Sequence, residues 1–148
     1  MLNKILDKLD SIFLPNEEEE KPKMITNEML FSEVYNIKAE KVKEHTTHFE
    51  VIGTTETRID KDGKTTIIRK PIEFTVPKSL VTEAMMKWVY SNKYVLLISQ
   101  SSLYYFTVDV KKLYLPNKDN IVFSTFDKEL VNAVIEAAKA VYAFKYIV

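Results

Sequence analysis

The stretch HFEVIGTTETRIDKDGKTTIIRKPIEFTV, residues 48–76, decides the fold of this chain. It contains two runs rich in β-branched residues, one on each side of Asp62-Gly63. An Asp-Gly pair readily adopts the positive backbone angles that a two-residue hairpin turn needs. The sequence therefore predicts a long antiparallel hairpin with its turn at Asp62-Gly63.

The position of the turn sets the register of the two strands. With a two-residue turn, Lys61 lies opposite Lys64, and counting outward places Val51 opposite Phe74. A three-residue loop with a glycine bulge is the alternative, but it would place Val51 opposite Glu73. Because a strand that joins a core aligns apolar residues with apolar residues, we favour the two-residue turn.

The two ends of the hairpin differ in composition. Apolar residues face each other at the base, residues 49–53 against 72–76, whereas the outer half carries mainly threonine and charged residues. We therefore expect the base to join the core and the outer half to project or lie exposed. Glu56 opposite Arg69 predicts a cross-strand ion pair. Pro71 has no N–H to donate, so it predicts an edge strand or a bulge.

The spacing of apolar residues predicts the remaining elements. Residues 38–44 alternate lysine and glutamate without a clear apolar stripe, so their conformation stays open. The runs over 93–99 and 103–110 are almost continuously apolar, which favours strands covered on both faces. The other predicted elements are a helix over 1–14, a helix capped by Thr26 or Asn27, a helix over 77–90, a loop over 117–120, a strand over 121–125 and a helix over 127–144.

Together these elements predict an α+β fold. We expect one domain over residues 24–148, in which two to three helices pack on a mainly antiparallel sheet of four to five strands. An amphipathic helix over residues 1–14 precedes it, and residues 15–23 form an acidic linker between the two. A chain of 148 residues is long enough to bury such a core.

The first 14 residues carry an apolar stripe at helical spacing. A helix of this length is marginal alone in water, so its stripe needs a surface: its own domain, a second copy of the chain, or the groove of a partner. A membrane surface is disfavoured, because Glu17–Glu20 would be repelled by anionic lipid. The predicted partner-binding residues are Leu2, Ile5, Leu6, Leu9, Ile12 and Phe13.

The composition excludes several classes of function. The chain has two glycines, too few for a glycine-rich phosphate-binding loop, and no cysteine for disulfides, thiolate catalysis or cysteine zinc sites. Its 21 basic and 21 acidic residues cancel, so no overall charge draws it to nucleic acid. The sequence contains no run of about 18 consecutive apolar residues, the length that predicts a membrane span. We therefore expect a protein of the reducing cytoplasm, with no cofactor and no bound metal.

The motif Asp109-Val110-Lys111 closes a predicted strand. An acidic residue that holds a divalent metal, followed two positions later by a lysine that helps to activate water, resembles half of the signature of restriction-type nucleases. Glu83, on the preceding helix, is the candidate second carboxylate. The chain departs from that superfamily at residues 99–102, which lack its first metal-binding aspartate. As an alternative function, the resemblance implies an active or decayed nuclease centred on Glu83, Asp109 and Lys111.

The outer half of the hairpin carries five basic side chains, and a two-stranded ribbon fits a groove of DNA. Threonines rather than stacking aromatic residues lie between these charges, and acidic residues are interspersed among them. A second alternative is therefore weak, non-specific binding of nucleic acid. The candidate residues are Arg58, Lys61, Lys64, Arg69 and Lys70.

Two further groups have an ordinary interpretation. His45 and His48 lie three positions apart with no third ligand close in sequence, so surface imidazoles at the entry of a strand are favoured over a metal site. Tyr104-Tyr105-Phe106 alternates between the two faces of a strand, so packing in the core is favoured over a platform for stacking bases.

No catalytic set is complete in this sequence. We therefore predict a non-enzymatic binding or assembly protein that acts through the helix over 1–14 and the hairpin over 48–76. Such a protein would bind a protein partner or associate with itself as a homo-oligomer, and it would suit a virus or a mobile element.

Overall fold

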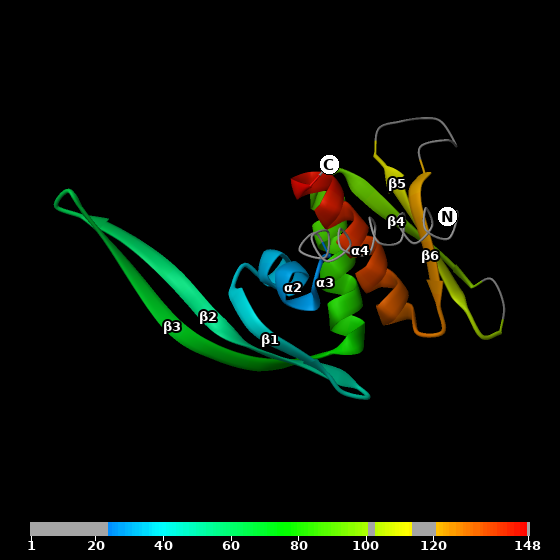
Figure 1. Cartoon of the computed structure of the whole chain (residues 1–148), viewed down its shortest axis with the longest axis horizontal. Coiled ribbons are helices and arrows are strands. Elements are labelled where there is room, and N and C mark those ends of the chain that lie inside the picture. The colour runs from blue at the N-terminus through cyan, green and yellow to red at the C-terminus, as the bar shows by residue number, and fades with distance from the viewer. Residues whose placement is uncertain (1–23, 101–102, 114–120, 148) are drawn as a thin grey trace, which may run out of the picture.

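Two separate antiparallel sheets organise the chain (Figure 1). The computed structural model describes residues 24–100, 103–113 and 121–147, which form three helices and two three-stranded sheets, so the fold is α+β. The prediction of one sheet with four to five strands is wrong. Outside the described residues lie the predicted helix over 1–14, the linker over 15–23 and the loop over 117–120.

The hairpin forms two strands of the first sheet. β2 (His48–Lys61) pairs with β3 (Lys64–Pro77) in the predicted register over the full length of both strands. Asp62 and Gly63 both have positive φ, at 56° and 76°. These angles confirm the two-residue turn that the Asp-Gly pair predicts.

β1 (Lys38–Glu44) pairs with the other side of β2, which leaves β3 at the edge of the sheet, as Pro71 predicts. The sequence pattern missed this strand because its register shifts between Ala39 and Lys41. The shift places Ala39 and Val42 three positions apart although both pack against the core. The period of two that identifies a strand is therefore lost.

The second sheet consists of strands that follow one another both in the chain and in space: β4 (Tyr94–Gln100), β5 (Phe106–Lys112) and β6 (Ile121–Asp127). Val108 and Val110 of β5 have no exposed surface, whereas Leu97 of β4 is 44% exposed. Of the cover on both faces that the sequence predicts for these strands, the described residues supply one face. Within the described residues, helices cover one face of the sheet only.

Three helices lie between the two sheets (Figure 1): α2 (Asn27–Tyr35), α3 (Lys78–Ser91) and α4 (Leu130–Tyr146). Thr26 caps α2, because its Oγ1 accepts the N–H of Met29 at 3.2 Å. None of these described helices combines the length and the apolar character that crossing a membrane requires. Fully buried side chains from both sheets and all three helices form one core: Leu30, Phe31, Phe49, Val51, Val81, Met85, Val89, Val108, Val110, Val134 and Val141.

Candidate functional site

The outer half of the hairpin stands apart from the rest of the molecule. The first residue of β1, Lys38, pairs with Thr54, so beyond that point β2 has β3 as its sole neighbouring strand among the described residues. Every residue from 56 to 71 is exposed. Figure 1 shows this ribbon extending away from the helices. We call residues 55–70 the distal arm.

Strand alternation sorts the side chains of the distal arm onto two faces. Residues directly opposite each other in an antiparallel pair share a face, and successive residues alternate between faces. One of these faces continues the side of β2 that packs in the core. It carries all three lysines of the distal arm, and we call it the lysine face. Its members are Thr55, Thr57, Ile59, Lys61, Lys64, Thr66, Ile68 and Lys70.

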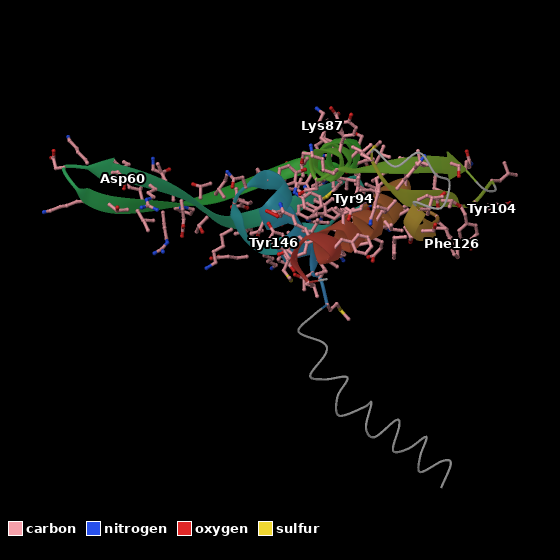
Figure 2. The ribbon with its side chains drawn as sticks, turned by 90° about the horizontal axis from the view of Figure 1, so that it is seen from above. Asp60, Lys87, Tyr94, Tyr104, Phe126 and Tyr146 are labelled. Atoms are coloured by element: carbon pink, nitrogen blue, oxygen red, sulfur yellow. The ribbon has the colours of Figure 1, made fainter. Side chains whose placement is uncertain are left out.

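The opposite face is neutralised by ion pairs. Arg69 Nε lies 2.8 Å from Glu56 Oε1, which confirms the predicted cross-strand pair. The hydrogen bond from Arg69 lowers the pKa of the Glu56 carboxyl below its ordinary value. Arg58 Nε lies 3.5 Å from Asp60 Oδ1, and Figure 2 labels Asp60 near the end of the arm. Both arginines of the chain are therefore engaged by carboxylates on this face.

The lysine face has no such compensation. Lys61, Lys64 and Lys70 form no ion pair with any residue that the structure describes. Between them lie two isoleucines, of which Ile59 is 42% exposed. The five basic residues that we identified from the sequence as candidates for binding nucleic acid are thus divided between the two faces of the arm. The lysine face combines positive charge with exposed methyl groups, which suits an acidic surface that also has apolar groups.

The structure does not bring the candidate nuclease residues together. Asp109 lies between Val108 and Val110, whose side chains are buried against the helices, so its own side chain points to the opposite face of the sheet. There its Oδ1 accepts a hydrogen bond from Ser124 Oγ at 2.6 Å. Glu83 lies on α3, which packs on the helix side of that sheet.

The second sheet therefore lies between the two carboxylates. Glu83 is 2.9 Å from Lys87 on its own helix, and Lys111 shares the face of Asp109. Within the described ranges, no group of three or more histidine or acidic side chains is arranged to hold a metal ion. This arrangement offers no shared centre for the metal chemistry that Asp109-Val110-Lys111 resembles.

The two histidines lie at the turn between β1 and β2. Their rings stack with centroids 4.6 Å apart, and His45 Nε2 lies 3.7 Å from Glu50 Oε1. The same hollow is lined by Lys78, whose role the sequence did not reveal. Lys78 Nζ lies 3.0 Å from Glu44 Oε2 and 3.4 Å from Glu129 Oε2. It thereby links the end of β1, the start of α3 and the segment before α4.

Replacing Lys78 with methionine removes its ion pairs with Glu44 and Glu129, so it is expected to lower the melting temperature at pH 7. The decrease should be only a few degrees, because the site is partly open to solvent. The hydrogen bond with Glu44 raises the pKa of Lys78 above its ordinary 10.5. A raised folded-state pKa stabilises the fold while the lysine is charged, and this stabilisation is lost as pH rises through that pKa. The difference in melting temperature between the two proteins should therefore shrink above about pH 10.5. Lys87→Met is the control, because it breaks only the pair within α3. An unchanged or growing difference at high pH would contradict this role for Lys78.

Aromatic residues at the far end of the second sheet are more exposed than expected. Tyr104 is 72% exposed, so the prediction that it packs in the core is wrong. Tyr105 meets Phe126 of β6 edge to face, with ring centroids 5.7 Å apart. Figure 2 shows Tyr104 and Phe126 at the end of the molecule opposite Asp60. The six predicted partner-binding residues over 2–13 lie outside the described residues.

The candidate site is therefore the exposed lysine face of the distal arm, and the residues that the structure describes assemble no group of carboxylates and histidines able to hold a metal ion. Comparisons of the chain with models of protein families, with curated proteins and with solved structures gave no match.

Proposed function

We propose that this chain is a non-enzymatic assembly protein in which the lysine face of one copy binds the acidic segment Glu17–Glu20 of a second copy. The observation that carries this proposal is the sorting of charge on the distal arm. Three uncompensated lysines share one exposed face, while the arginines are paired with acids on the other. The chain itself supplies the complementary partner, because four consecutive glutamates precede the described residues and the net charge is zero.

The position of the acidic segment favours a second copy over the same one. Met24 and Ile25 line a hollow with Phe123 of β6 and Ala140 of α4, so the chain enters the described part beside the second sheet. The distal arm belongs to the first sheet, on the other side of the helices (Figure 1). Residues 17–20 lie at most seven positions before Met24, a reach of about 25 Å. The arm alone extends about 23 Å beyond Thr54, at about 3.3 Å per residue.

The shape of the arm supports contact through side chains rather than through its edge. A two-stranded ribbon with no third strand is marginally stable in water, so an exposed one gains stability from a partner. Lysines and Pro71 on the edge strand oppose the addition of another strand. Ile59 and Ile68 can bury their methyl groups under a bound segment while the lysines meet its carboxylates.

A nucleic acid is a poorer partner for the same face. Both arginines, which would read phosphates bidentately, are paired with carboxylates on the other face. Threonine and isoleucine separate the lysines, whereas single-stranded nucleic acid is bound by stacking on aromatic side chains.

Sedimentation equilibrium of the full chain tests the proposal. At low salt we expect the average mass to exceed 17.2 kDa and to rise with protein concentration. A lysine-reversed variant, with Lys61, Lys64 and Lys70 changed to glutamate, should remain at the monomer mass. About 1 M salt, which shortens the screening length to about 3 Å, should also dissociate the wild-type assembly.

The control changes Lys43, Lys87 and Lys128 to glutamate, which alters net charge equally but leaves the distal arm intact. This control variant should assemble like the wild type at matched salt. Loss of assembly in both variants would reduce the effect to net charge, and a wild-type chain that stays monomeric at every concentration would refute the proposal. Binding of duplex DNA by the wild type, but not by the lysine-reversed variant, without self-association would assign the face to nucleic acid instead.

A further inference from the structure

The second sheet leaves an apolar face without a cover in the described part of the chain. Its inner face packs on α3 and α4, and an antiparallel sheet with one face in water normally turns polar residues outward. Here each edge strand also turns large apolar side chains outward, beside Ser99 on β4 and Ser124 on β6. We call this surface the outer face, and its apolar members are Leu97, Tyr105, Ile121 and Phe126.

The exposure of the outer face is large for such residues. Phe126 is 67% exposed and Leu97 is 44% exposed. The central strand contributes Thr107, Asp109 and Lys111 between them, and the Asp109 carboxylate accepts a hydrogen bond from Ser124 Oγ. A covering element would therefore bury apolar groups on both sides of a polar row. In that row Asp109 already has a hydrogen-bond partner, and Lys111 lies near the end of the strand, where its long side chain can keep the ammonium group in water.

We propose that the predicted N-terminal helix, residues 1–14 of the same molecule, packs its apolar stripe on this outer face. The stripe is apolar at positions 2, 5, 6, 9, 12 and 13, and a helix of this length requires a surface to be stable. The length of the predicted helix agrees with the length of the strands that it would cover. Fourteen helical residues span about 21 Å, and strands of seven residues span about 23 Å. This inference is independent of the charge contact proposed for the distal arm.

The point at which the chain enters the described part supports docking within one molecule. Met24 and Phe123 of β6 line the same hollow, so the chain arrives at the edge strand of the second sheet. The linker over 15–23 spans up to about 30 Å. Three strands are about 10 Å across, so the helix can pass around β6 and reach the outer face.

The exposed side of α3 is the competing surface. It presents Leu80 and Tyr90, which are comparably exposed. Between them, however, lies the ion pair of Glu83 with Lys87. An apolar helix laid there would cover this pair, and removing water from a surface ion pair costs more than its attraction returns. The outer face has no equivalent ion pair among the described residues.

Paramagnetic relaxation in solution tests the docking, because a chain without cysteine can be labelled at a single introduced one. A nitroxide is attached to the Lys8→Cys variant, on the polar side of the predicted helix. At low protein concentration we expect loss of amide signals from β4 and β6, including those of Leu97 and Phe126. Signals from the distal arm should remain. The same label at position 61, in the Lys61→Cys variant, is the control and should leave the second sheet unaffected.

A mixed sample and a pair of matched variants make each outcome decisive. Isotope-labelled wild type mixed with unlabelled spin-labelled chain should show no signal loss from the second sheet, since loss there would mean that the helix docks on the sheet of a second copy. Leu97→Asp should abolish the effect in the spin-labelled chain, whereas Leu80→Asp, a similarly exposed leucine on α3, should not. The proposal is overturned by signal loss on α3 in place of the second sheet, by loss from the second sheet in the mixed sample, or by no loss from the second sheet in the spin-labelled chain.

Discussion

Replacing Phe31 with alanine is expected to lower the free energy of unfolding by about 4 kcal/mol, within the usual range for a buried phenylalanine. Phe31 has no exposed surface, and its ring centroid lies 5.3 Å from that of Phe49 and 5.7 Å from that of Tyr35. It belongs to α2, and Phe49 belongs to β2, so this contact attaches the base of the hairpin to the helices. Truncation leaves a cavity at that junction.

Chemical denaturation followed by circular dichroism measures this loss. Phe31→Leu keeps most of the buried volume and should cost only about 1 kcal/mol, so the two variants separate cavity formation from the loss of an aromatic ring. If Phe31→Ala unfolded at nearly the same denaturant concentration as the wild type, Phe31 would not lie in a packed core.

Replacing Gly53 with alanine should cost about 3 kcal/mol, because overpacking at rigid atoms is destabilising. An added Cβ would lie 2.2 Å from the carbonyl oxygen of Lys38 and 2.9 Å from Cα of Ala39. These are backbone atoms of β1, so no side chain can rotate away. Gly53 lies opposite Ala39 beside the register shift, and the substitution should push β1 away from β2.

The same substitution at the other glycine is the matched control. Gly63 has a φ of +76° and nothing within 4 Å of an added Cβ. Gly63→Ala should therefore cost only about 1 kcal/mol, from the left-handed backbone alone. Amide hydrogen exchange should show the damage of Gly53→Ala in β1 and that of Gly63→Ala at the tip of the arm. Equal stability of the two variants would refute the close approach of β1 to β2.

The hairpin was predictable because its chemistry is local. Asp62-Gly63 determines the turn, and counting outward from it determines every pair of β2 with β3. The strand β1 was not predictable from the spacing of apolar residues. The register shift near Ala39 moves Val42 onto the face that a regular strand would not give it. The division into two sheets was not predictable either. It depends on the packing of the helices between the two sheets, a tertiary arrangement with no short sequence signal.

The candidate site was partly predictable. The sequence identified all five cations of the distal arm and the pair of Glu56 with Arg69. It missed that the lysines and the arginines occupy opposite faces, although the register and simple alternation contain this information. The pairing of Arg58 with Asp60 was not predictable, because residues two apart on a strand share a face and the conformations of their side chains decide whether they meet.

The most direct test of assembly through the lysine face is a mixing experiment between two variants with opposite changes. The lysine-reversed variant has negative charge on both the arm and residues 17–20, and an acid-reversed variant, with residues 17–20 changed to lysine, has positive charge on both. Each should sediment alone as a monomer of about 17.2 kDa at low salt. Mixed in equal amounts, they should associate, because each arm then meets an oppositely charged segment. A mixture that stays monomeric, beside a wild type that assembles, would contradict the account.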